Sequence, residues 1–293
     1  MKIVFVAVFK PSSTNVSQAN ALRRQGADLI EYDYRAEQAK HDTRDQRDDA
    51  LISLVRSVQP DAVLFSKCSK MGLQVITELK QVTKCLYWFM DPAGRFRRES
   101  LLKGTACHHS FISRQGALDR LQQVIDSSGS DTTTSLLCEG FDADVDYQED
   151  VAPIRDCCFI GNLRADRGEY VKELSIPVIK GRYGHDHAIA VGETKINLNF
   201  SEGDGCSDRV YKILAAGGFL LTQPWDGMEA HFKPGVHLDV FTSPAELKQK
   251  IDFYLNNKEQ RATIAAAGWA RVQRFGRDSW AAKIVETIEG YSV

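Results

Sequence analysis

Polar and charged side chains gather where a loop opens a predicted helix in the second half of the chain. Segment 197–222 has the pattern of a loop, a helix and a buried strand, and Ser207, Asp208 and Arg209 stand where the helix begins. A helix N-terminus offers unpaired N–H groups and the positive end of its dipole, which suit an anionic phosphate. Loop, helix, glycine and strand also follow one another in ordinary α/β proteins, so this pattern alone leaves a purely structural role open.

The same region and the segment after it carry a set of residues in a fixed order: Arg209, Ala215, Gly217, Phe232, Pro234, Gly235, Ser243, Pro244, Glu246, Leu247, Arg261, Ile264, Ala265 and Gly268. With this set the chain resembles the C-terminal half of a glycosyltransferase, specifically the CgeB-like (spore-maturation-type) branch of the family-4-like GT-B enzymes. The resemblance is weaker over 159–162 and weakest in the N-terminal half. It implies an α/β fold of two Rossmann-like, doubly wound domains, with a donor nucleotide sugar on the C-terminal half and the acceptor facing the N-terminal half.

Apolar strands alternate with amphipathic helices along the first half of the chain, beginning with a strand at 2–8. This order predicts a parallel sheet covered on both faces, whose ligands bind beyond the carboxyl ends of the strands. The composition turns Ser/Thr-rich and then acidic after residue 126, and a second strand–helix cycle follows. We expect a first domain at 1–135, a linker at 136–155, a nucleotide-sugar-binding domain at 156–278, and a C-terminal helix at 279–293 that the resemblance places back on the first domain.

Composition limits the classes of protein to which the chain can belong. Its 293 residues are 43% hydrophobic and 26% charged with a net charge of −2, which is typical of a soluble globular protein without a general attraction to nucleic acid or membrane. No apolar run approaches the ~20 residues of a membrane helix. Seven scattered cysteines without C-x-x-C spacing favour free thiols in a reducing compartment. We expect a cytoplasmic protein with no membrane span and no bound cofactor.

A transferase without a metal must neutralise its leaving diphosphate with protein groups. Arginine suits this task because its guanidinium carries several fixed donors, and Arg209 is the first candidate. In the resembled family a glycine loop lies against the donor phosphates, and here it contributes Gly161, Asn162, Arg164 and Arg167. Solvated arginines at a helix start are an alternative for the last two. We expect a metal-independent site for a nucleotide sugar, with a UDP-sugar as the co-substrate.

Lys212 departs from the family pattern. The resembled enzymes usually carry a glutamate there, which hydrogen-bonds the donor ribose, and the nearest equivalent of its partner acid is Asp204. A lysine cannot accept a hydroxyl hydrogen bond as a carboxylate does. Either the ribose is held by other groups, or Lys212 contacts a phosphate or a carboxylate-bearing sugar. We favour an altered donor site over a lost one.

The first half offers candidates for the acceptor side. Transfer to a hydroxyl is helped by a group that takes the acceptor proton, and Asp91 follows a predicted strand where such a base is wanted. An Asx-type turn before a proline is the alternative for Asp91. His109 is a second base candidate, although histidines near strands are more often packing residues. Ser13 and Thr14 could approach the acceptor or a diphosphate, or could cap the next helix.

Arg95, Arg97 and Arg98 form a basic cluster directly after Asp91. Beside a catalytic base, such a cluster would follow the phosphates of a DNA acceptor, as in phage-type enzymes that glucosylate modified bases. The alternative is a solvated helix face paired with Glu99. The near-neutral charge of the whole chain argues against nucleic acid.

Acidic pairs along the chain do not predict a metal site. Asp142, Asp144 and Asp146 repeat a D-x-D pattern, but they fall in the acidic stretch that we interpret as a solvated linker. We therefore expect no metal ligands.

The sequence thus predicts a metal-independent GT-B glycosyltransferase that moves a sugar from a nucleoside diphosphate to a hydroxyl of a glycan, a small molecule or a DNA base. Two alternatives remain. A non-catalytic binding protein would keep the scaffold with an altered donor site at Lys212. A sugar-nucleotide epimerase would use the same diphosphate site without a second substrate.

Overall fold

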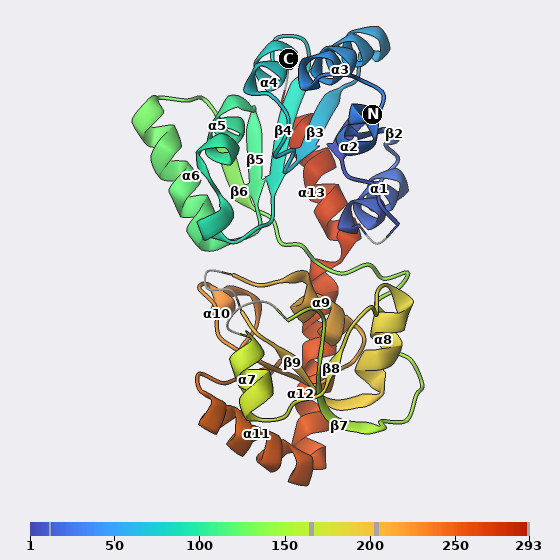
Figure 1. Ribbon diagram of the computed structural model, residues 1–293, viewed down its shortest axis with the longest axis vertical. Helices are drawn as coiled ribbons and strands as arrows, with labels where there is room; N and C mark the ends of the chain where they lie inside the picture. The colour runs from blue at the N-terminus through green and yellow to red at the C-terminus, as the bar shows by residue number, and fades with distance from the viewer. Residues whose placement is uncertain (12, 164–166, 202–204, 292–293) are drawn as a thin grey trace. The chain divides into compact units, whose positions relative to one another are not determined.

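Two compact units make up the protein. The computed structural model describes residues 1–11, 13–163, 167–201 and 205–291 (Figure 1). Unit 1 comprises Met1–Cys138 and Arg277–Val293, and unit 2 comprises Glu139–Gly276. The expected linker at 136–155 is therefore divided between the units after Cys138, and most of it belongs to unit 2.

Unit 1 is built on a six-stranded parallel sheet in the order β2-β1-β3-β4-β5-β6. Successive residues of a strand point to opposite faces, so Val4 and Val6 of β1 enter one core while Ile3 and Phe5 enter the other. The strands are β1 (Lys2–Ala7), β2 (Asp28–Asp33), β3 (Ala62–Ser66), β4 (Lys84–Phe89), β5 (His109–Ile112) and β6 (Thr133–Leu136).

Helices cover both faces of this sheet. Apolar side chains of α3, α4, α5 and α6 fill one core, and those of α1 and α13 fill the other. The helices are α1 (Thr14–Arg24), α2 (Tyr34–Gln38), α3 (Arg44–Val58), α4 (Leu73–Leu79), α5 (Arg98–Ala106), α6 (Gln115–Ser128) and α13 (Arg277–Gly290), with a 3-10 turn η1 at Ala93–Arg95.

The C-terminal helix α13 is an integral part of unit 1 and lies beside α1 (Figure 1). Trp280 is 2% exposed and packs edge-on against Trp88 of β4, with ring centroids 5.4 Å apart. At the start of the helix Arg24 forms an ion pair with Asp278 at 2.7 Å. The last helix therefore completes one face of the first sheet.

Unit 2 contains a five-stranded parallel sheet in the order β11-β10-β9-β7-β8. One face packs on α11 and α12, while α8 and α9 contact β7, β9 and β10. Its strands are β7 (Arg155–Ile160), β8 (Val178–Ile179), β9 (Thr194–Asn199), β10 (Leu220–Thr222) and β11 (Asp239–Val240). Its helices are α7 (Arg167–Glu173), α8 (His185–Gly192), α9 (Asp208–Ala215), α10 (Met228–His231), α11 (Pro244–Asn256) and α12 (Lys258–Val272), with a 3-10 turn η2 at Gln273–Phe275.

These two parallel-sheet units confirm the predicted α/β fold class. None of the described helices combines the length and the apolar character that crossing a bilayer requires.

Trp280→Ala should destabilise unit 1 by about 3–5 kcal/mol, because it removes a fully buried indole and leaves a cavity against Trp88. Urea unfolding followed by circular dichroism measures the loss. Trp269→Ala is the matched control, since Trp269 on α12 is 43% exposed, and this variant should unfold near the wild-type midpoint. Equal midpoints for both variants would show that α13 contributes little to the stability of unit 1.

Candidate functional site

Arg209 joins the carboxyl ends of two neighbouring strands in unit 2. Its Nε donates to the carbonyl of Ile160, the last residue of β7, at 2.9 Å. Its Nη1 donates to Oδ1 of Asn199, the last residue of β9, at 3.0 Å. The guanidinium carbon also lies 4.7 Å from the ring centroid of Phe159. Arg209 therefore stands at the edge of the sheet where ligands of parallel α/β folds bind.

Gly161 makes room for this guanidinium. Its φ is 147°, and a Cβ built at this position would lie 2.7 Å from Nη2 of Arg209. The glycine thus lets the chain end β7 directly against the arginine. Sequence analysis grouped the glycine loop with Arg209 as expected donor-binding residues, and the structure brings Gly161 and Arg209 into contact.

Other predicted members of the glycine loop are described only in part. Asn162 follows Gly161 and is exposed. Arg167 begins α7, but its side chain lies outside the described part of the chain, as does the whole of Arg164.

Asn199 organises the beginning of α9. Its side chain is fully buried, and Oδ1 accepts from Ser207 Oγ at 3.2 Å as well as from Arg209. Its Nδ2 donates to Oγ1 of Thr222, the last residue of β10, at 2.9 Å. Ser207 is the N-cap residue of α9, but its hydroxyl makes this bond to Asn199 and does not cap the first turn. Sequence analysis missed Asn199, although an asparagine ending an apolar strand was a usable signal.

Lys212 and Asp208 form an ion pair one turn apart on α9, with Nζ and Oδ2 separated by 2.7 Å. Both side chains are half-buried. The lysine is therefore held close to the N-terminal turn that carries Arg209. Asp204, the other acid expected here, lies outside the described residues.

His187 on α8 adds a neutral polar group to this cluster. Burial, together with the charges of Lys212 and Arg209, lowers the pKa of His187 to about 4, so the imidazole is uncharged at neutral pH. Its Nδ1 is buried and meets no hydrogen-bond partner among the residues that the structure describes.

Asp91 occupies the corresponding edge of the sheet in unit 1. It lies two residues beyond β4, and its Oδ2 is 2.6 Å from Nζ of Lys67, which directly follows the neighbouring strand β3. Both side chains are partly exposed. The predicted base is therefore a carboxylate at the carboxyl edge, paired with a lysine that sequence analysis missed.

His109 is the first residue of β5 and so lies at the amino end of the strand, away from the edge that carries Asp91. Its Nδ1 lies 2.7 Å from Thr133 Oγ1 and its Nε2 lies 2.9 Å from Ser135 Oγ. Burial lowers the pKa of His109 to about 4, with a smaller contribution from Lys283. This position is a correction to the expected role of His109 as a second base, and we no longer propose that role.

Ser13 and Thr14 begin α1 beyond the carboxyl end of β1. The hydroxyl of Ser13 accepts from the backbone N–H of Asn15 at 3.3 Å, which is the capping role considered as its alternative. Thr14 is the first helical residue. Asn15 then ties the helix to the sheet, because its Oδ1 accepts from Ser66 Oγ at 2.9 Å.

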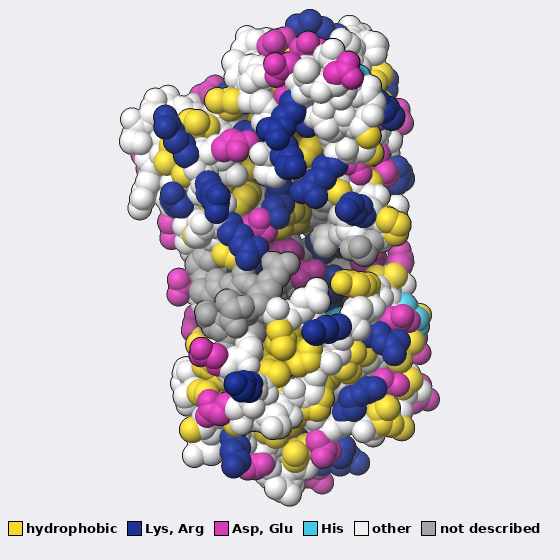
Figure 2. Space-filling model, in the orientation of Figure 1, with side chains coloured by type: hydrophobic (Ala, Val, Ile, Leu, Met, Phe, Trp, Pro, Cys, Tyr) yellow, Lys and Arg dark blue, Asp and Glu magenta, His cyan; other side chains and the backbone are white. Residues whose placement is uncertain are grey.

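Three exposed arginines lie in the segment that follows Asp91. Arg95 lies in η1, Arg97 is the N-cap residue of α5, and Arg98 is its first residue. Glu99, the expected partner of these arginines, instead binds Lys103 one turn later. Figure 2 shows many Lys and Arg side chains on the visible face of unit 1.

The D-x-D stretch is a correction to the expected solvated linker. Asp142 and Asp146 are buried, and they order their own turn: Asp142 N–H donates to Asp146 Oδ2 at 2.9 Å, and Asp144 N–H donates to Asp142 Oδ1 at 3.2 Å. Across the described ranges, no three His, Cys, Asp or Glu side chains gather as metal ligands would.

Comparisons with known proteins agree with this fold. Residues 149–286 match the family described as "Glycosyl transferase-like". No curated protein sequence matches the chain significantly.

Similar solved structures span nearly the whole chain. Anabaena HepE in complex with UDP-glucose has a TM-score of 0.72 at 13% identity, covering 99% of this chain and 100% of its own. Sucrose-phosphate synthase from Thermosynechococcus elongatus has a TM-score of 0.72 at 11% identity, covering 99% and 98%. An alpha-glucosyltransferase in complex with UDP-glucose and DNA containing an abasic site has a TM-score of 0.69 at 10% identity, covering 98% and 99%. The chain therefore has the GT-B fold that the sequence predicts.

Gly161→Ala should lower the free energy of unfolding by about 1–3 kcal/mol, because the new methyl group meets the fixed guanidinium of Arg209 at a positive φ. Urea denaturation measures the change. Gly168→Ala in α7 is the control, since a Cβ there meets nothing within 4 Å and alanine favours a helix. A Gly161→Ala protein as stable as the control would mean that Arg209 does not depend on this glycine.

Unit 1 should lose stability in mild acid because of His109. Its pKa is about 4 in the folded protein and 6.5 in the unfolded chain, so the unfolded chain binds the proton first as the pH falls below 6.5. Between pH 7 and pH 5 this histidine should therefore cost about 2 kcal/mol of stability. Urea unfolding of the wild-type and His109→Gln proteins at both pH values measures the difference, and identical pH dependence in the two proteins would contradict it.

Proposed function

We propose that this protein is a GT-B glycosyltransferase of the CgeB-like branch, which moves a sugar from a nucleoside diphosphate to a hydroxyl acceptor. The observation that carries the proposal is Arg209, fixed by Ile160 and Asn199 at the carboxyl edge of unit 2. The solved structures that share this fold include complexes with UDP-glucose, which supports a UDP-sugar as the donor.

Protein groups alone can neutralise the diphosphate of this donor. Arg209 donates to the carbonyl of Ile160 and to the amide oxygen of Asn199, and a guanidinium held at this edge suits the oxygens of a phosphate. Lys212, which is paired with Asp208, lies one turn along the same helix, and the dipole of α9 points its positive end toward Arg209. We infer a metal-independent donor site, in which Lys212 contacts phosphate where the related enzymes contact ribose.

Asp91 supplies the base on the acceptor side. The acceptor hydroxyl gives its proton to the Asp91 carboxylate while its oxygen bonds to the anomeric carbon of the sugar. The bond from that carbon to the diphosphate oxygen breaks, and the electron pair leaves with the nucleoside diphosphate. The ammonium of Lys67 lies 2.6 Å from this carboxylate.

DNA is a second candidate acceptor. Arg95, Arg97 and Arg98 are exposed in the segment that follows Asp91, and they could contact backbone phosphates. The similar alpha-glucosyltransferase structure that contains DNA supports this choice. A glycan or small-molecule hydroxyl remains the broader proposal.

Arg209→Ala should abolish stabilisation by UDP and lower the cleavage of UDP-glucose by roughly 10²-fold or more, because the leaving diphosphate loses a fixed cation. Thermal shift with UDP and release of UDP from UDP-glucose, both in EDTA, are the measurements. Arg155→Ala is the control, since Arg155 lies at the opposite end of β7 and binds Glu193.

Retained turnover in the Arg209→Ala protein would refute the assigned donor site. Analysis of the wild-type products separates the three functions predicted from sequence. Transferred or hydrolysed sugar supports a transferase, an isomerised donor supports an epimerase, and an unchanged donor supports a binding protein.

A further inference from the structure

The turn after β3 has an unusual backbone. Lys67 and Cys68 are consecutive non-glycine residues with φ values of 60° and 47°, both in the left-handed region. Side chains disfavour this conformation, so it persists only where the surroundings enforce it, and such turns cluster at functional sites.

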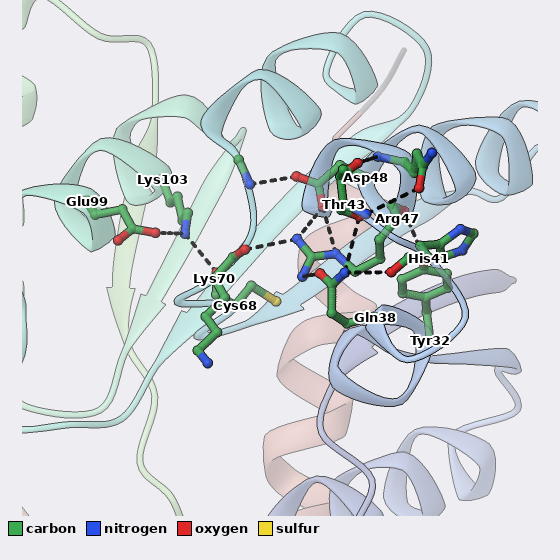
Figure 3. A network of polar contacts seen from close by, with 12 residues as sticks. Tyr32, Gln38, His41, Thr43, Arg47, Asp48, Cys68, Lys70, Glu99 and Lys103 are labelled. Atoms are coloured by element: carbon green, nitrogen blue, oxygen red, sulfur yellow. Dashed lines mark hydrogen bonds and ion pairs between the residues drawn. The ribbon is translucent and has the colours of Figure 1, made fainter.

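Contacts from several elements hold this turn in place (Figure 3). Lys103 of α5 is fully buried, and its Nζ donates to the carbonyl of Cys68 at 2.7 Å. The thiol of Cys68 donates to the carbonyl of Val6 at 3.2 Å. The phenol of Tyr87 donates to the carbonyl of Lys67 at 3.1 Å. The carbonyls of both left-handed residues are thus bound by buried side chains.

A buried ion pair fixes the rest of the turn (Figure 3). Arg47 and Asp48 of α3 are 1% and 3% exposed and bind each other. Arg47 Nη2 donates to the carbonyl of Lys70 at 2.9 Å, and Asp48 Oδ2 accepts from the N–H of Gly72 at 2.8 Å. Since burying charges is costly, three buried charged side chains are more than a surface turn needs for stability alone.

The turn after β3 places the Lys67 side chain. Its ammonium lies 2.6 Å from Asp91 Oδ2, where β3 and β4 end side by side. This contact uses Oδ2 and restrains the carboxylate at that oxygen, so Oδ1 can accept from another hydrogen-bond donor. The hydroxyl of an acceptor is such a donor.

We propose that Lys67 is a positioning residue, which the left-handed turn holds in place so that its ammonium orients the Asp91 carboxylate toward the acceptor hydroxyl. This inference rests on the proposed function, in which Asp91 takes the acceptor proton. An ordinary ion pair at the surface would instead contribute little to stability, and removing it would leave the reaction rate unchanged.

Three variants test this inference. Lys67→Asn removes the ammonium, and asparagine tolerates the left-handed backbone, so the turn should survive. Lys67→Arg keeps the charge. Lys70→Asn is the matched control, because Lys70 belongs to the same turn but has an exposed side chain. The assay is the hydrolysis of UDP-glucose, with water as the acceptor, alongside thermal shift with UDP.

Lys67→Asn should lower kcat roughly 10²-fold, as expected for a misplaced catalytic group, while KM for UDP-glucose and the shift with UDP stay at wild-type values. Lys67→Arg should recover most of the lost rate, and Lys70→Asn should match wild type. Equal kcat for Lys67→Asn and Lys70→Asn would overturn the inference. A loss of kcat in Lys67→Arg as large as that in Lys67→Asn would overturn it too. Failure of the wild-type protein to bind UDP would instead refute the proposed donor site.

Crystal structures of the two asparagine variants test the positioning without any substrate. The Asp91 carboxylate should keep its orientation in Lys70→Asn and lose it in Lys67→Asn. An unchanged Asp91 in both would overturn the inference even if the protein proved to have another activity.

Discussion

The contacts of the Arg209 side chain hold together the donor site that we propose in unit 2. It crosses from the start of α9 to the carbonyl that ends β7 and to the amide that ends β9. Gly161 leaves the space for this crossing, and Asn199 holds both the arginine and Ser207. A guanidinium fixed in this way needs little rearrangement to bind an anion. The conformational entropy of its side chain is lost during folding and not during binding.

Unit 1 also positions charged side chains at the carboxyl edge of its sheet, but with different groups. The carboxyl edge of its sheet carries a carboxylate and an ammonium, Asp91 and Lys67, and the left-handed turn after β3 carries the lysine. Buried charges on α3 and α5 hold that turn through its carbonyls and N–H groups. In both units, then, polar groups inside the fold position a charged side chain at the carboxyl edge of a parallel sheet.

The sequence predicted the α/β class because strands and helices alternate with clear apolar patterns. It also grouped Arg209 with Gly161, and the two lie in contact in the structure, because a helix start and a glycine loop are local signals. Lys67 was not predictable in this way, since its partner is distant in sequence and a left-handed lysine has no sequence signature. His109 begins its strand, and ligands of a parallel sheet bind beyond the carboxyl ends of the strands, so the direction of the chain already argued against the role predicted for it. The D-x-D turn was misjudged because a local pattern does not reveal that Asp142 and Asp146 are buried.

A crystal structure of the wild-type protein grown with UDP and EDTA tests the central claim most directly. The diphosphate should lie within hydrogen-bonding distance of Arg209 at the start of α9, with Lys212 turned toward a phosphate oxygen. UDP bound elsewhere, or bound with the diphosphate away from Arg209, would contradict the donor site proposed for unit 2.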